Sequence, residues 1–147
     1  RPVPSAFPTS LSYGGDAWNL TYTPTNSSSD PGNTKVVVIR QGFSTHANNF
    51  GQRYLELATS YTQNQDTGEV TMHVSQLPPN ANILTPGPVM LFLVVDGVPS
   101  IGKMITAGSG AIETQPISAA TVLPASSVIV PSSSSNSTSD ASNSTVS

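Results

Sequence analysis

Apolar and polar residues alternate with a period of two in several short stretches before residue 107. In residues 18–22 the large side chains are Trp18, Leu20 and Tyr22, and residues 70–74 repeat the alternation. This period places the apolar side chains on one face of a β-strand and the polar ones on the other. Both stretches are therefore predicted to be strands with one buried face.

Two other stretches are apolar almost without interruption, which is typical of strands covered on both faces. Residues 35–40 contain a β-branched run that is too short for a typical helix. Residues 89–95 form the most apolar run, and the Asp96-Gly97 pair after it indicates a hairpin into residues 100–106. We predict a central strand at 35–40, and antiparallel pairing of 89–95 with 100–106.

Residues rich in Pro, Gly and Ser separate these strands. Loops are predicted at residues 23–34 and 77–87, where prolines remove backbone donors, and one more short strand is predicted around residues 54–57. About seven short strands without an amphipathic helix favour an all-β fold, and we predict an immunoglobulin-like β-sandwich. A small barrel is the alternative.

The composition changes after residue 107. From there on the chain has no aromatic residue, only two acidic residues, and an excess of Ser, Thr, Ala and Asn, which bury too little apolar area to offset chain entropy. We therefore predict one domain at residues 1–107 and a disordered Ser/Thr-rich tail or linker at 108–147. The small apolar island at residues 128–130 allows a stray edge strand as an alternative.

Charge and cysteine content exclude several classes of function. The 147 residues carry a net charge of −3 with only five Lys and Arg, so the chain lacks the clustered cations that nucleic-acid binding requires. The absence of Cys excludes disulfides, thiolate metal sites and a cysteine nucleophile. No serine hydrolase motif is present, and no apolar stretch is long enough to span a bilayer.

Several asparagines fit the acceptor pattern for N-glycosylation. Two of these candidates lie in the tail, whose composition is typical of extracellular stalks. We therefore expect a secreted glycoprotein, with association to a cell wall as a further option. The candidate glycosylation sites are Asn19, Asn26, Asn136 and Asn143.

His46 is the candidate for metal chemistry. It lies in a polar segment bracketed by Gly42 and Gly51 that follows the predicted central strand, where an imidazole can reach a metal ion or a partner. One histidine cannot form a copper site alone, and from the residues alone an ordinary loop histidine is the competing interpretation. Gln52 and Arg53 either support this loop or form a plain structural polar pair.

Three blocks of sequence, taken together in this order and spacing, resemble one family. Over residues 1–106 the chain resembles the C-terminal domain of the fungal copper radical oxidases, the glyoxal oxidase and galactose oxidase family. The sequence around His46 resembles glyoxal oxidases more than galactose oxidase. The blocks are Arg1-Pro2 with Ser12-Tyr13-Gly14; residues 40–53 with Ser44-Thr45-His46 and Gln52-Arg53; and Pro86-Gly87-Pro88, Met90-Leu91-Phe92 and Gly97-Val98-Pro99-Ser100.

The resemblance implies an immunoglobulin-like early set domain beneath a seven-bladed β-propeller of the same parent chain. It implies that His46 is a copper ligand, and that the other ligands and the Tyr-Cys radical cofactor belong to the propeller. The family oxidises aldehydes or primary alcohols with O2 to give H2O2. Since this chain has no Cys and none of its four Tyr matches the family motifs, we expect it to be inactive alone.

Two further hypotheses belong to other classes of function. The chain can be a non-catalytic, immunoglobulin-like structural or binding module of a secreted or cell-wall protein. Alternatively, His46 and His73 together can hold a metal ion in this chain, although they are placed on separate predicted elements. The aromatic residues Phe43 and Phe50 either pack against a propeller or pin the ends of the loop to the sandwich core.

Overall fold

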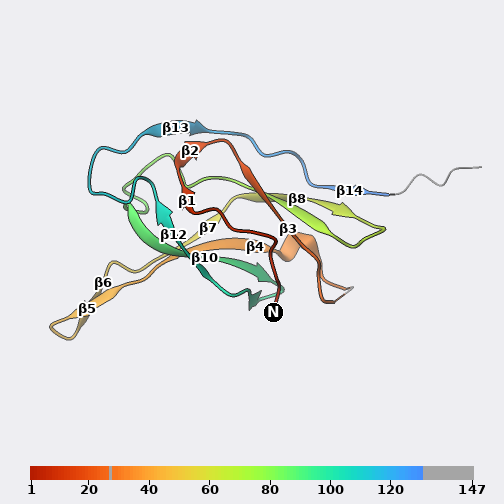
Figure 1. The fold of residues 1–147 in the computed structure, drawn as a ribbon, viewed down its shortest axis with the longest axis horizontal. Helices are drawn as coiled ribbons and strands as arrows, with labels where there is room; N and C mark the ends of the chain where they lie inside the picture. Colours follow the sequence, from red (N-terminus) through yellow and green to blue (C-terminus); the bar gives the residue numbers. More distant parts are fainter. Residues whose placement is uncertain (27, 131–147) are drawn as a thin grey trace, which may run out of the picture.

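Short strands with alternating burial form two β-sheets that pack face to face (Figure 1). The structure is a computed structural model that describes residues 1–26 and 28–130. The larger sheet has the order β1 (Ser10–Leu11), β12 (Lys103–Ala107), β10 (Gly87–Val95), β4 (Lys35–Arg40) and β7 (Arg53–Leu57), and β11 (Val98–Pro99) pairs with β10. The smaller sheet has the order β14 (Ser127–Ile129), β8 (Thr59–Asn64), β9 (Val70–Val74) and β3 (Trp18–Tyr22).

Two additional strand pairs complete the described part of the chain. β2 (Tyr13–Gly15) pairs in parallel with β13 (Ile117–Ala120), and β5 (Phe43–Thr45) pairs with β6 (Asn48–Phe50) in an antiparallel hairpin. A single 3-10 turn, η1 (Pro31–Asn33), is the one helical element among the described residues. No helix in the described ranges is long and apolar enough to cross a membrane.

The core lies between the two sheets and confirms the predicted all-β sandwich. Val36 and Val38 of β4 and Leu91 of β10 are fully buried in one cluster with Leu20 of β3 and Met72 of β9. These residues alternate along their strands, as the period of two predicts. Burying such side chains contributes about 1.5–3 kcal/mol each to the stability of the fold.

The central strand and the hairpin predicted from the sequence are both confirmed. β4 lies between β10 and β7, and Val37 on its outer face is only 2% exposed, so both of its faces are covered. β10 pairs antiparallel with β12 and with the short β11. Between β10 and β11, Asp96 and Gly97 have φ values of 49° and 79°, as expected in a type I′ turn.

Residues 108–130 differ from the prediction of a disordered tail. They form a strap, the name used below for this segment, which pairs along β2 through β13 and along β8 through β14. The prediction was wrong here because the strap is held mainly by backbone hydrogen bonds, which do not depend on apolar side chains. The remaining residues of the predicted tail, 131–147, lie outside the described part of the chain.

Polar contacts hold the start of the strap together and join its later part to neighbouring elements. Gln115 is 8% exposed and its Oε1 accepts a hydrogen bond from the Ser109 amide at 2.8 Å. The Thr121 amide donates to the Gly15 carbonyl at 3.2 Å, and the Gln65 amide donates to the Ile129 carbonyl at 3.1 Å. The strap therefore supplies backbone partners to β2 and to the outer edge of β8 in the smaller sheet, which otherwise would be open to other chains.

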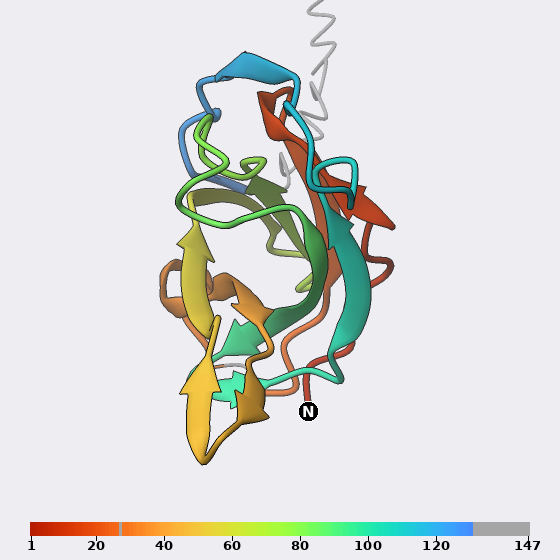
Figure 2. The ribbon, with the colours of Figure 1, turned by 90° about the vertical axis from the view of Figure 1, so that its left-hand side faces the viewer.

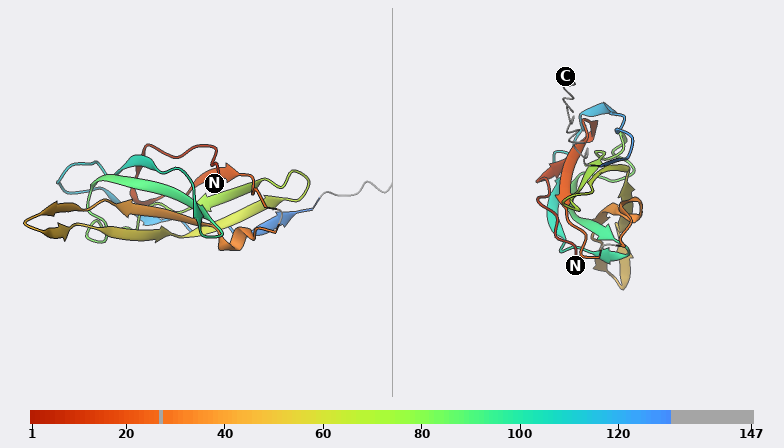
Figure 3. Two further views of the ribbon diagram at one scale, coloured as in Figure 1. Left: turned by 90° about the horizontal axis from the view of Figure 1, so that it is seen from below. Right: turned by 90° about the vertical axis from the view of Figure 1, so that its right-hand side faces the viewer.

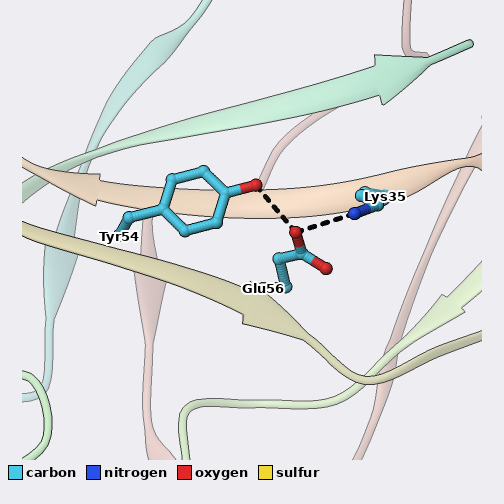
Figure 4. A network of polar contacts seen from close by, with 3 residues as sticks. All are labelled: Lys35, Tyr54 and Glu56. Atoms are coloured by element: carbon cyan, nitrogen blue, oxygen red, sulfur yellow. Dashed lines mark hydrogen bonds and ion pairs between the residues drawn. The ribbon is translucent and has the colours of Figure 1, made fainter. Parts of the chain in front are cut away.

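A polar network lies on the outer surface of the larger sheet (Figure 4). The Lys35 ammonium and the Tyr54 hydroxyl donate to the same Glu56 oxygen at 2.9 and 2.8 Å, and Lys35–Glu56 is the one ion pair among the described residues. Lys35, and after it Tyr54, hold the pKa of Glu56 below its ordinary value. The folded state therefore favours the ionised carboxylate.

Replacing Glu56 with Gln is expected to lower the urea midpoint slightly at pH 7. A carboxyl whose pKa is lowered by folding stabilises the protein above its unfolded pKa, and this contribution is lost as the pH falls through the folded pKa. The difference between variant and wild type should therefore disappear near roughly pH 2. Glu113→Gln is the control, because the Glu113 side chain has no bond among the described residues. If the difference in urea midpoint between variant and wild type persisted unchanged at the acidic pH, the lowered pKa of Glu56 would be contradicted.

Candidate functional site

The segment that carries His46 is a hairpin that projects from one end of the sandwich, the end opposite to β14 (Figure 3). It leaves the larger sheet after β4 and returns to it at β7. Its strands β5 and β6 pair only with each other, in the register Phe43↔Phe50 and Thr45↔Asn48. Every residue from 41 to 54 is exposed, so the hairpin extends beyond the core rather than covering it (Figure 2).

The tip of this hairpin has a strained backbone. His46 and Ala47, the two central residues of the turn, have φ values of 54° and 60°. The type I′ turn requires positive φ at both positions, and Asn and Gly usually occupy them. Each non-glycine residue in this region costs roughly 1–2 kcal/mol. Backbone strain of this kind clusters at functional sites. Here the strained turn places the His46 imidazole at the tip of the hairpin.

Hydrogen bonds orient the His46 side chain. The Thr45 Oγ1 and the His46 Nδ1 lie 2.8 Å apart, and the Asn48 side-chain amide donates to the His46 carbonyl at 3.3 Å. Within the described ranges the second ring nitrogen, Nε2, has no hydrogen-bond partner. When Nδ1 carries the proton and donates it to Thr45, the lone pair of Nε2 is available to a metal ion.

Exposed aromatic rings flank the hairpin. The Phe43 and Phe50 rings stack with their centroids 5.5 Å apart, and they are 62% and 44% exposed. Tyr54, at the start of β7, is 62% exposed as well. Neither Phe belongs to the core cluster, so the hypothesis that these rings pin the loop to the core is wrong. The rings form an apolar surface that the described part of the chain leaves uncovered.

Gln52 and Arg53 lie at the foot of the hairpin. The Arg53 Nη1 donates to the Gln52 carbonyl at 2.8 Å. In the described ranges neither side chain has a hydrogen bond to residues 43–50, so they do not hold the hairpin carbonyls. Their role as supports of a metal site stays a prediction.

Arg40, also at the foot of the hairpin, has a structural role that the sequence pattern alone does not reveal. Its Nη1 donates to the Thr85 carbonyl at 2.6 Å and to the Pro86 carbonyl at 3.3 Å. These bonds tie the end of β4 to the loop that crosses between the sheets. The sequence contains one indication of this role, because Arg40 is a charged residue at the end of an otherwise apolar strand.

His73 is placed differently from His46. It lies half-buried in β9, where its Nδ1 is 2.9 Å from the Asn19 Oδ1 and its Nε2 is 3.0 Å from the Thr62 Oγ1. Both ring nitrogens are therefore occupied within the smaller sheet. No group of three or more potential His, Cys, Asp or Glu metal ligands occurs in the described part of the chain. A metal site that includes His46 would need ligands from another source.

Two of the candidate glycosylation sites lie on the described surface. Asn19 is exposed on the edge strand β3, and Asn26 is exposed in the following loop, where its Oδ1 accepts a hydrogen bond from the Ser28 amide at 3.0 Å. Asn136 and Asn143 lie outside the described residues.

Comparisons with known proteins match one family model and four chains of solved structures. The family model for the galactose oxidase-like, early set domain matches residues 1–107. A solved fungal alcohol oxidase, in complex with copper, is 25% identical in sequence with a TM-score of 0.49. The match covers 72% of this chain and 20% of the oxidase, so the chain spans about a fifth of that oxidase's length. No curated protein matches the chain.

Proposed function

The chain belongs to the galactose oxidase-like early set domain family, and from this premise we propose that it is the C-terminal domain of a copper radical oxidase. In this proposal His46 supplies one copper ligand. A β-propeller domain of the same parent chain supplies the remaining ligands and the Tyr-Cys radical cofactor. The chain alone is then catalytically inert, and its second task is to cover one face of the propeller.

The observation that carries the proposal is the position of His46. Its imidazole lies at the tip of a projecting hairpin, its Nδ1 is 2.8 Å from Thr45, and its Nε2 has no partner among the described residues. Imidazole is a suitable ligand for copper, and a hydrogen bond to the second ring nitrogen fixes the tautomer of a ligating histidine. The site therefore fits one copper–imidazole bond through Nε2.

The residues around His46 would each have a defined task. Thr45 holds the imidazole in one tautomer and orientation, and the turn at His46 and Ala47 presents it at the end of the hairpin. The Phe43–Phe50 stack would exclude water where the hairpin enters the other domain. Copper, when bound, would take one of the two electrons removed from an aldehyde or primary alcohol, and the tyrosyl radical would take the other.

The exposed aromatic surface supports the proposal that a second domain covers this end. A domain complete by itself rarely leaves stacked aromatic rings in water, whereas interfaces are enriched in them. Both rings lie on the same hairpin as His46. The exposed aromatic surface and His46, which would need further copper ligands, therefore lie on the same hairpin.

The experiment that tests this proposal is sequencing of the native transcript upstream of the Arg1 codon. The proposal expects an in-frame propeller that carries two tyrosines, a histidine and a cysteine for the copper radical site. A signal peptide that ends at Arg1 would overturn it and leave a non-catalytic, immunoglobulin-like module. Both outcomes are read directly, without folding or activity measurements.

We further propose that the protein is exported and glycosylated. The exposed side chains of Asn19 and Asn26 support this, because a glycan on either would extend into solvent. Native protein is expected to lose mass on treatment with an N-glycosidase, and Thr21→Ala should remove the contribution of Asn19. A mass that matches the bare polypeptide would contradict the proposal of glycosylation.

A further inference from the structure

Two arginines face each other at the foot of the hairpin. Arg40 at the end of β4 and Arg53 at the start of β7 are direct partners in the antiparallel ladder. They continue the rows of Val36 and Val38 on β4 and of Leu55 and Leu57 on β7, which point toward the core. The strand period therefore places both guanidinium groups on the same side, at the open end of the sandwich.

Neither arginine forms an ion pair with a carboxylate within the described part of the chain. Arg40 donates to the carbonyls of Thr85 and Pro86, and Arg53 donates to the carbonyl of Gln52. The ion pair between Lys35 and Glu56 is the single one in the described ranges. Like charges directly opposite each other destabilise a pair of strands, so this arrangement has a cost that the chain itself does not offset.

The two arginines line a cavity of about 440 Å³. Its wall also contains Phe43 and the glycines Gly42 and Gly51, which border the hairpin on both sides. A side chain at Gly42 would come within 2.5 Å of the Gln52 side chain, so the wall of the cavity is already closely packed there. Because Phe43 borders the cavity and is 62% exposed, any domain that covers the hairpin also covers the cavity.

We propose that this cavity receives the carboxylate of an Asp or Glu side chain from the domain that covers the hairpin. The proposal rests on the proposed function, since it assumes that domain. Removing two guanidinium groups from water without an anion costs several kcal/mol per ion. A carboxylate offsets this cost, because it accepts paired, charge-assisted hydrogen bonds from arginine. The acidic residue would lock the hairpin, and with it His46, in place.

Arg53 is the better position for the test. Its side chain has one bond, to the neighbouring Gln52 carbonyl, whereas Arg40 holds the crossing loop and its loss would disturb the fold. The variants are Arg53→Gln and Arg53→Glu, and Arg1→Gln is the control for the loss of a distant positive charge. Each substitution is made both in the 147-residue chain and in its parent protein.

The midpoint of thermal unfolding is expected to fall in the parent but not in the chain alone. In the chain alone, Arg53→Gln removes repulsion from Arg40, so the midpoint should stay constant or rise. In the parent, the same change leaves the acidic partner buried without its cation, and the midpoint should fall by several degrees. Arg53→Glu should lower it further, since two carboxylates then meet. Equal shifts in chain and parent would overturn the proposal.

A second measurement separates a free carboxylate from a protein side chain. Acetate at 100 mM in place of chloride is the probe, applied to chain and parent. The proposal expects acetate to raise the midpoint of the chain at most slightly and to leave the parent unchanged. A rise in the parent that Arg53→Gln removes would mean that a small carboxylate occupies the cavity, and would overturn the acidic-partner proposal.

Copper content distinguishes failure of this inference from failure of the proposed function. If copper binding in the parent depends on His46 while the Arg53 variants behave alike in chain and parent, only the carboxylate contact is wrong. If the parent has no propeller or its copper does not depend on His46, the proposed function fails and this inference fails with it.

Discussion

The proposed parent oxidase with His46→Ala is expected to lose its copper and its turnover. The variant removes the single imidazole that this chain can offer at the hairpin tip, and a methyl group cannot ligate copper. Changes to groups that merely orient a ligand cost 10–100-fold in metal affinity, so loss of the ligand itself should cost at least about 100-fold. Metal analysis after dialysis and peroxide production with an aldehyde substrate measure the two effects.

The control for this prediction is His73→Ala. His73 bonds Asn19 and Thr62 within the smaller sheet, so its loss should affect stability but not copper content. His46 lies outside the core, and His46→Ala should change the unfolding free energy of the chain alone by less than about 0.5 kcal/mol. Normal copper content and turnover in His46→Ala would show that the hairpin is not a ligand-bearing element.

Replacing Gly14 with Ala is expected to release part of the strap and to destabilise the fold by more than about 2 kcal/mol. Gly14 has a φ of 71°, and an added Cβ would lie 1.8 Å from the carbonyl oxygen of Ser118 in β13. The substitution therefore adds backbone strain and a clash with backbone that cannot move away while β13 and β2 remain paired. Urea unfolding measures the loss, and hydrogen exchange of residues 117–121 locates it.

Gly68→Ala is the matched control for the strap prediction. Gly68 has nearly the same φ, 70°, but an added Cβ would meet no atom within 4 Å. It should therefore show only the backbone cost of roughly 1 kcal/mol, without faster exchange in the strap. Equal losses of stability in the two variants would mean that the close approach of Ser118 to Gly14 has no energetic role.

The strands that the sequence predicted are those whose burial depends on apolar side chains. β4, β9 and β10 carry their own signal, because valine, leucine or methionine occupies every buried position except Gly87 at the start of β10. β8 (Thr59–Asn64) carries no such signal, since Tyr61 is its one large apolar side chain. Its place in the sheet is set by backbone pairing with β9, which a local pattern does not reveal.

Apart from the edge-strand alternative at residues 128–130, which β14 bears out, the strap and the hairpin escaped prediction for a related reason. All residues of β13, β14, β5 and β6 are exposed, so no period of burial marks them. β13 is held next to β2 because Gly14 leaves room for a backbone that approaches closely. Such pairing depends on residues far apart in the chain. Composition alone therefore predicts disorder for the strap, residues 108–130, and this prediction is wrong.

At the candidate site, the sequence indicated the residue but not its surroundings. The residues that flank His46 mark it as a candidate, whereas the positive φ values at the tip and the contact with Thr45 follow only from the fold. The pairing of Arg40 with Arg53 needed the register of β4 and β7. In the sequence these arginines are separated by the whole hairpin, so nothing marks them as neighbours.

In the proposed site, His46 ligates copper through its imidazole. Pulsed electron paramagnetic resonance on the Cu(II) form of the parent counts the imidazole nitrogens coupled to the metal, and excess Cu(II) restores occupancy in weakened variants. His46→Ala is expected to show one coupled imidazole fewer than the wild type, and His73→Ala an unchanged number. The same number of coupled imidazoles in His46→Ala and the wild type would contradict it.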